Sequence, residues 1–200
     1  MTIGFINEFD WKRIIYRMLY PGVLGSMIFD LLDPVRDFTL FLFPRLALAL
    51  IFVIDYHHMT VGLDVEKNDN ANPGLDLLIA ILFCSSYFFL AHIDKAEQNS
   101  CFRCMMSLIF LTFAFLLIFL YEVRFVKFVK RVDMLRLMPT FICIPGVVLV
   151  GLSSTFNNVF LPFFFTLITI CLSLVFYSIY VSKVDLKNRG RHKGQPLKYK

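Results

Sequence analysis

The sequence predicts an all-α protein, a polytopic membrane helix bundle of about six transmembrane helices in three hairpins, and its composition is the first reason. Hydrophobic residues make up 58% of the 200 residues, Phe occurs 24 times and the mean hydropathy is +0.70. A water-soluble domain of this length needs a more polar surface. The second reason is the stretch from Leu137 to Ser182, where 46 consecutive residues include no charged residue and no His. About 20 helical residues cross a bilayer core, so this stretch fits two crossings and a turn.

The residues outside the predicted spans are too few for a soluble domain, so residues 1–200 are expected to form a single integral membrane domain. Residues 1–13 combine Trp11 and large apolar side chains with charged ones. This pattern is typical of a helix that lies in the membrane interface, and a frayed polar terminus is the alternative. No cleavable signal peptide is expected, because Glu8 and Asp10 fall where its apolar core would begin.

The first predicted hairpin is the weakest of the three. Residues 14–32 are mainly apolar but interrupted by Arg17, Asp30 and several helix-breaking residues. Residues 38–61 are more strongly apolar, and Pro44 suits the first turn of a helix there. The alternative fold therefore has four spans plus an interfacial or re-entrant N-terminal pair. A polar linker follows over residues 63–73.

The second and third hairpins are clearer. Residues 77–91 and 105–121 are free of charge and predict two limbs joined by the loop over residues 92–104. The third hairpin should turn at residues 153–158 and continue into a long limb over residues 159–181.

Basic residues predict the orientation of the bundle. The tail over residues 183–200 contains seven Lys or Arg, and the segment over residues 122–136 contains five. Cytoplasmic loops carry an excess of such residues, so both segments and both termini are expected in the cytoplasm. The expected location is the inner (plasma) membrane of a bacterial-type cell.

Asp55, His57 and His58 are the first candidate site residues, because ionisable groups within a span are costly and often functional. Asp55 and His58 are three residues apart and share a helix face, which suits a proton relay, a gate or half of a metal site. We favour a simpler interpretation, in which these residues end the helix near the inner headgroups. No further ligands accompany them at metal-binding spacing, so no metal is expected.

Arg45 is the second candidate. It precedes Asp55 by ten residues, about 15 Å along a helix, so the two cannot pair within one straight helix. We expect its side chain to snorkel to the outer surface. An inward-facing Arg45 would favour anions in a pore.

Cys101 and Cys104 form a CxxC pair at the outer end of a predicted helix. The pair resembles one of the cysteine pairs of membrane thiol oxidoreductases, which implies disulfide exchange with a soluble partner. Those enzymes need a second pair, whereas Cys84, Cys143 and Cys171 lie singly within predicted spans. Idle thiols or a structural disulfide are the simpler interpretation.

Two basic segments are predicted to contact anionic lipid headgroups or a cytoplasmic protein partner, and nucleic-acid binding is not expected. Alternatively they only determine topology. A polar stripe on the last span, Thr166, Thr169 and Ser173, could line the bundle centre or a homo-oligomer interface. The basic candidates are Arg124, Lys127, Lys130, Arg131, Lys187, Arg189 and Arg191.

The sequence contains no nucleotide-binding loop, catalytic triad or zinc-protease motif, which counts against an enzyme, and no cofactor is expected. By architecture alone the chain is similar to small multi-span membrane subunits of bacterial anti-phage systems. That resemblance implies a self-associating, channel-like or membrane-perturbing subunit that works with a cytoplasmic partner. One alternative is a small-solute or proton-coupled transporter that uses Asp55 and His58. The other is a thiol oxidoreductase that uses Cys101 and Cys104.

Overall fold

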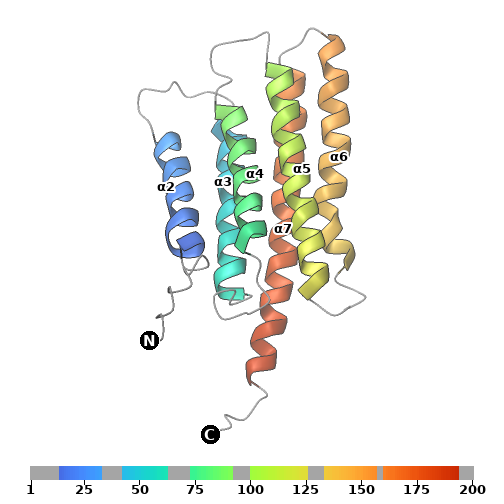
Figure 1. Ribbon diagram of the computed structural model, residues 1–200. Helices are drawn as coiled ribbons and strands as arrows, with labels where there is room; N and C mark the ends of the chain where they lie inside the picture. Colours follow the sequence, from blue (N-terminus) through green and yellow to red (C-terminus); the bar gives the residue numbers. More distant parts are fainter. Residues whose placement is uncertain are drawn as a thin grey trace, which may run out of the picture.

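The computed structural model describes residues 14–32, 42–62, 73–91, 100–125, 133–156 and 160–193, and these ranges are helical almost throughout (Figure 1). The prediction of an all-α fold is confirmed. Six α-helices lie in the described ranges, namely α2 (Tyr20–Leu31), α3 (Leu42–His57), α4 (Pro73–Ala91), α5 (Ser100–Phe125), α6 (Asp133–Ser153) and α7 (Phe160–Lys193). Short helical turns extend three of them, namely η1 (Ile15–Leu19) before α2, η2 (His58–Gly62) after α3 and η6 (Ser154–Phe156) after α6.

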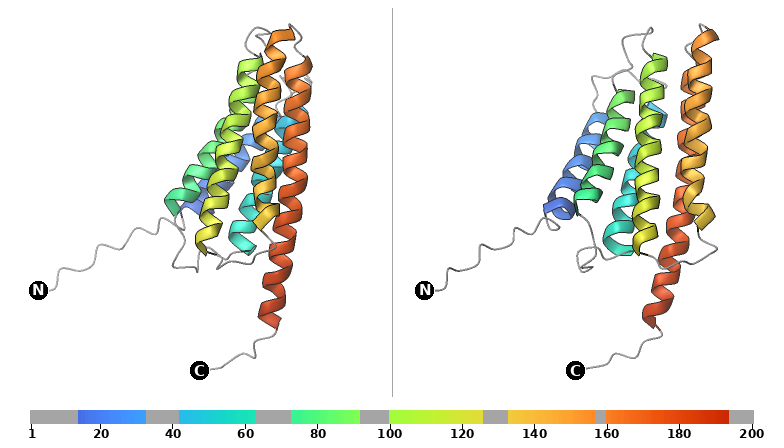
Figure 2. Two further views of the ribbon diagram at one scale, coloured as in Figure 1. Left: turned by 90° about the vertical axis from the view of Figure 1, so that its right-hand side faces the viewer. Right: turned by 45° about the vertical axis from the view of Figure 1, so that its right-hand side comes forward.

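The helices stand side by side and successive ones run in opposite directions (Figures 1 and 2). Four of them form a closed core, because α3 packs on α4, α4 on α5, α5 on α7, and α7 on α3. The remaining two flank this core, with α2 against α3 and α4 and α6 against α5 and α7. We call the end where α2, α4 and α6 begin the lower end of the bundle. Because α7 also ends there, the described chain enters and leaves the bundle at the same end.

Five helical segments are long and apolar enough to cross a membrane, which makes the chain a multi-pass membrane protein. Within the described residues they are Leu42–Thr60, Gly74–Ala91, Ser100–Leu120, Leu137–Phe156 and Phe160–Val184. The five include α3 with η2, one span more than the alternative fold has. The N-terminal helix is shorter, since η1 and α2 have 5 and 12 residues, and it stands upright against α3 and α4 (Figure 1). A sixth crossing by this helix, and the cytoplasmic position of the lower end, stay predictions.

Proline positions shape the first helix. Pro21 lies in the first turn of α2, directly after η1, where the Tyr20 N–H donates to the carbonyl of Ile15 five residues earlier. A proline ring clashes with the regular turn before it, and a widened turn of this kind makes room for the ring. Tyr16 and Tyr20 are both buried as a result of the path that the helix takes here.

The third hairpin agrees with its predicted boundaries. Its turn includes η6, inside the predicted 153–158, and α6 continues through Pro139 and Pro145. The two limbs approach closely where Gly146 of α6 meets Thr169 of α7. The predicted basic tail begins at residue 183, but the helix of α7 continues through it to Lys193.

Several predictions fall outside the residues that the structure describes. The proposed interfacial segment over residues 1–13 is one of them, as are Lys127, Lys130 and Arg131. For four further basic residues only the backbone is described, namely Arg124, Lys187, Arg189 and Arg191.

Candidate functional site

Four buried aromatic residues, one from each helix of the four-helix core, meet in the interior of the bundle. Phe52 of α3 lies edge-on to Phe83 of α4, with ring centroids 6.1 Å apart, and Phe83 lies edge-on to Phe115 of α5 at 5.9 Å. Phe115 in turn contacts Tyr177 of α7 at 5.4 Å. These edge-on and tilted distances are favourable for aromatic pairs. We call the four residues the aromatic collar, and their buried side chains fill the interior between the four helices.

Asp55 completes the collar. The Tyr177 hydroxyl donates a hydrogen bond to Asp55 Oδ1 at 2.6 Å, which joins α7 to α3 across 122 positions of the sequence. Asp55 is only 2% exposed and lies three residues after Phe52 on the same helix. Asp55 lies in the last turn of α3, as expected for a residue near the end of the helix, and its side chain is buried against α7.

His58 lies beside this pair on the lower side. Its side chain is buried, and its ring centroid is 6.0 Å from that of Tyr180, which also lies against Tyr177 at 6.3 Å. The predicted common face of Asp55 and His58 is therefore confirmed, and it faces inward. His57 is exposed and does not join the site.

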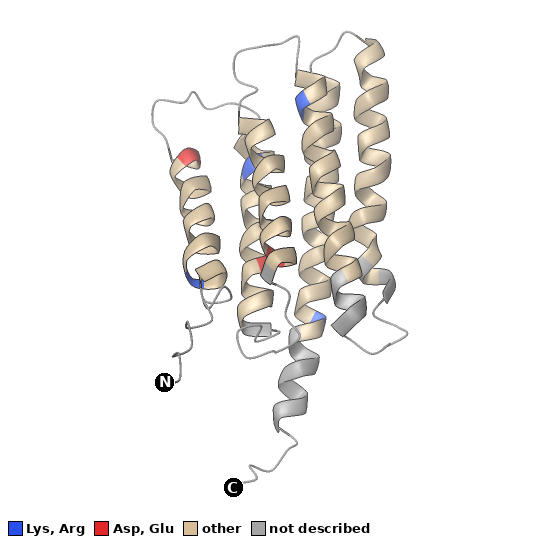
Figure 3. Ribbon diagram, in the orientation of Figure 1, with Lys and Arg blue, Asp and Glu red and all other residues tan. Residues whose placement is uncertain are grey.

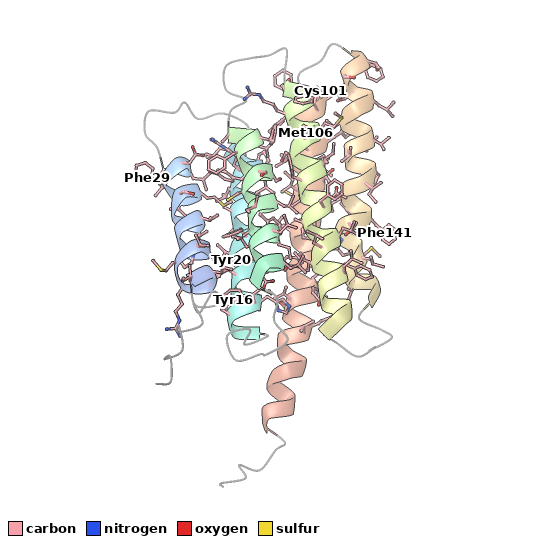
Figure 4. The ribbon with its side chains drawn as sticks, in the orientation of Figure 1. Tyr16, Tyr20, Phe29, Cys101, Met106 and Phe141 are labelled. Carbon is pink, nitrogen blue, oxygen red and sulfur yellow. The ribbon has the colours of Figure 1, made fainter. Side chains whose placement is uncertain are left out.

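A second buried acid, Asp76, was not among the predicted site residues. It lies in the first turn of α4, where the Tyr16 hydroxyl donates to its Oδ2 and the Tyr20 hydroxyl donates to its backbone carbonyl at 3.0 Å. The Tyr56 hydroxyl donates to the Tyr16 carbonyl at 3.1 Å. In Figure 4, Tyr16 and Tyr20 lie at the lower end of the first helix, toward α3 and α4. The signal in the sequence is two tyrosines four residues apart, which share a helix face.

Tyr20 links this second acid to the collar. Its ring stacks on Phe52 with centroids 5.2 Å apart and on Tyr56 at 5.7 Å. The two acids and their tyrosine partners thus form one connected cluster in the lower half of the bundle.

Arg45 forms a separate polar site toward the upper end. It is 2% exposed, and its Nη1 donates to Asp30 Oδ2 at 3.4 Å. The Tyr87 hydroxyl donates to the same oxygen at 2.8 Å and to the Met27 carbonyl at 3.0 Å. The expectation that Arg45 snorkels to the surface is wrong, because Asp30 of α2 offers it a partner within the protein. Arg45 Nε is buried and has no hydrogen-bond partner.

The described charges lie toward the two ends of the bundle, and the stretch between them is uncharged (Figure 3). The buried polar contacts within this uncharged stretch join neutral side chains. Ser86 of α4 and Ser107 of α5 lie 3.0 Å apart, and Ser173 of α7 lies 3.3 Å from the sulfur of Cys143 of α6. Thr166, Thr169 and Ser173 are all buried within the bundle. The predicted polar stripe therefore lines the bundle interior.

The cysteines do not support a redox site. All five are free thiols, and Cys104 is fully buried, where no soluble partner reaches it. Cys101 is half-buried, and its thiol donates to the Val150 carbonyl at 3.2 Å. Within the described ranges, no three His, Cys, Asp or Glu residues are grouped as metal ligands would be.

Comparison with protein-family models, with curated proteins and with solved structures finds no match. The helix lengths and hydropathy assign the chain to the multi-pass membrane proteins.

Proposed function

We propose that this protein is a gated, proton-translocating membrane protein in which Asp55 takes up and releases the proton and the aromatic collar is the gate. The observation that carries the proposal is the position of Asp55, an acid 2% exposed inside a membrane bundle and hydrogen-bonded to a residue of the collar. Burying an ionisable group at membrane depth is costly, and such groups mark ion and proton pathways.

The neighbours of Asp55 suit proton transfer. Tyr177 donates to the carboxylate, and His58 is buried on the same helix face, three residues away. Imidazole changes charge near neutral pH more readily than any other side chain, so it can pass a proton between the carboxylate and the lower end of the bundle.

The hydrogen bond between Tyr177 and Asp55 couples the gate to the residue that binds the proton. Rotation of Tyr177 out of the collar would break its contact with Phe115 and its bond to Asp55 in one movement. Protonation of Asp55 removes the negative charge that strengthens this bond and so favours the rotation. The closed collar then opens only when Asp55 is protonated.

Proton flux is common to two of the functions that the sequence predicts, the channel-like subunit and the proton-coupled transporter. The buried acid and its tyrosine support the conducting step in both. Self-association, a cytoplasmic partner and a role in anti-phage defence stay predictions. The buried thiol of Cys104 gives no support to the thiol oxidoreductase, because a soluble partner does not reach it.

The test is proton flux into vesicles that contain the full chain. A pH-sensitive dye is trapped inside, and a potassium gradient with valinomycin makes the interior negative. We expect the interior to acidify faster than in protein-free vesicles. Asp55→Asn keeps an oxygen that accepts the Tyr177 bond but cannot carry a proton, so the rate should fall to that of protein-free vesicles.

Two variants control this experiment. Asp55→Glu keeps a carboxylate and should retain part of the flux, and His57→Ala removes an exposed neighbouring histidine and should change nothing. Gel filtration in detergent checks that each variant is folded. Wild-type flux through Asp55→Asn, or no flux through the wild-type chain, would show that the proposal is wrong.

A further inference from the structure

An apolar groove of about 890 Å³ runs along the outer side of α4, between α2 and α5. It occurs beside the short α2 helix, which packs on α3 and α4. Its walls come from α2 with η1, from α4 and from α5, and are mainly aliphatic and aromatic. Leu19 of η1, Val23 of α2, Leu77 and Phe88 of α4, and Phe102 of α5 are among them.

The lining of the groove on α4 runs across the middle of the span Gly74–Ala91. From Leu77 near the lower end of α4 to Phe88 near its upper end is 11 residues, which is about 16 Å along a helix. Half of a bilayer hydrocarbon core is about 15 Å. A single extended acyl chain therefore matches the length of the groove.

One cation lies at the upper end of the groove. Arg103 is the only charged residue among the described residues that line it, and it is the fourth residue of the span that begins at Ser100. This position is one helical turn inside the span, at the depth of the headgroup boundary. Guanidinium groups bind phosphate oxygens with paired hydrogen bonds, and basic pockets beside transmembrane helices bind anionic headgroups.

We propose that this groove binds one anionic phospholipid of the leaflet at the upper end, with its phosphate on Arg103 and an acyl chain along α4 between α2 and α5. The site is distinct from the basic segments that the sequence predicts to contact lipid at the lower end. It does not depend on proton translocation. A bound chain here packs against both α2 and α5.

The test measures the lipid composition next to the groove. Phe88→Trp, in a chain whose native tryptophan is removed by Trp11→Phe, places a reporter in the groove wall. Phe164→Trp in the same background is the matched reference, because Phe164 is equally near the upper end of its helix and faces outward on α7, away from the groove. Both chains are reconstituted in phosphatidylcholine with a minority of brominated phosphatidylglycerol, whose bromines quench tryptophan on contact.

We expect about fivefold enrichment of phosphatidylglycerol at the groove reporter over the reference, the effect of one basic residue near an anionic lipid. Arg103→Gln should lower the quenching of the groove reporter to that of the reference. Lys183→Gln, which removes a cation at the other end of the bundle, should leave the quenching of the groove reporter unchanged. Equal quenching at both positions, or quenching that Arg103→Gln leaves unchanged, would overturn the proposal.

A second measurement needs no tryptophan. Native mass spectrometry of the wild-type chain with equal amounts of phosphatidylglycerol and phosphatidylcholine should show one preferentially retained phosphatidylglycerol. Arg103→Gln should remove the preference. Equal retention of the two lipids by the wild-type chain would also refute the site.

Discussion

Gly146→Ala is the substitution for which the structure predicts the clearest effect on stability. Gly146 is buried in α6, and a methyl group added there would lie 2.5 Å from Thr169 Oγ1 and 2.6 Å from Thr169 Cγ2 on α7. Ordinary van der Waals contacts begin near 3.4 Å. The Thr169 hydroxyl also donates to the Phe165 carbonyl at 2.7 Å, so rotating this side chain away costs a hydrogen bond.

The expected loss follows from two opposing terms. Overpacking a closely fitted contact costs about 1–3 kcal/mol. Replacing Gly by Ala inside a helix returns about 1 kcal/mol. Gly146→Ala should therefore lower the free energy of unfolding by up to about 2 kcal/mol, and should leave the chain about 1–3 kcal/mol less stable than a Gly→Ala change that meets no neighbour. Equilibrium unfolding in mixed micelles, followed by circular dichroism at increasing fractions of sodium dodecyl sulfate, measures this difference.

Gly25→Ala is the matched control. Nothing lies within 4 Å of a methyl group added at Gly25 of α2, so only the gain in helix propensity remains and the variant should be neutral or more stable. Thr169→Ala removes the two nearest atoms and should restore much of the stability lost by Gly146→Ala. A Gly146→Ala variant as stable as the Gly25→Ala variant would refute the close contact of α6 and α7.

Two further predictions concern buried polar pairs. Asp30→Asn leaves the charge of buried Arg45 without its carboxylate and should lower the free energy of unfolding by about 3 kcal/mol, while addition of Arg45→Gln should recover most of it in the same assay. Ser86→Ala removes the hydroxyl that pairs with the buried hydroxyl of Ser107 and should lower the free energy of unfolding by about 1–2 kcal/mol. Replacing both serines by alanine should leave the free energy of unfolding nearly unchanged. A double variant no better than the single one would contradict the pairing in either case.

The helices could be predicted because their signals are local. A charge-free stretch from Leu137 to Ser182 fixes two crossings by its length alone, and small polar residues near position 154 mark the turn. The helix that includes Pro44 begins at Leu42, which agrees with the preference of proline for a first turn.

The buried ion pair could not be predicted in the same way. Arg45 and Asp30 are 15 residues apart on the two limbs of the first predicted hairpin, and neither spacing nor hydropathy says which faces of α2 and α3 meet. A snorkelling arginine is the expectation for a single helix in lipid. The neighbouring helix changes that outcome by supplying a carboxylate.

The partners of the buried tyrosines could not be predicted from the sequence either. In a membrane sequence tyrosine is typical of the interface, where its hydroxyl meets water. Tyr16, Tyr87 and Tyr177 instead lie inside the bundle, and each donates to an acid. Asp55 was predicted as a candidate from its depth alone, but its partner on α7 depends on a contact across 122 positions.

The docking of α2 depends on polar contacts, whereas a helix of a soluble protein is docked mainly by its apolar area. Phe29 of this helix points away from the bundle (Figure 4), and lipid tails solvate such faces as well as another helix does. Hydrogen-bonding hydroxyl and carboxylate groups are what lipid cannot replace, and the helix has them at both ends, on Tyr16 below and Asp30 above. Single oxygen atoms, rather than apolar area, therefore decide whether this helix stays docked.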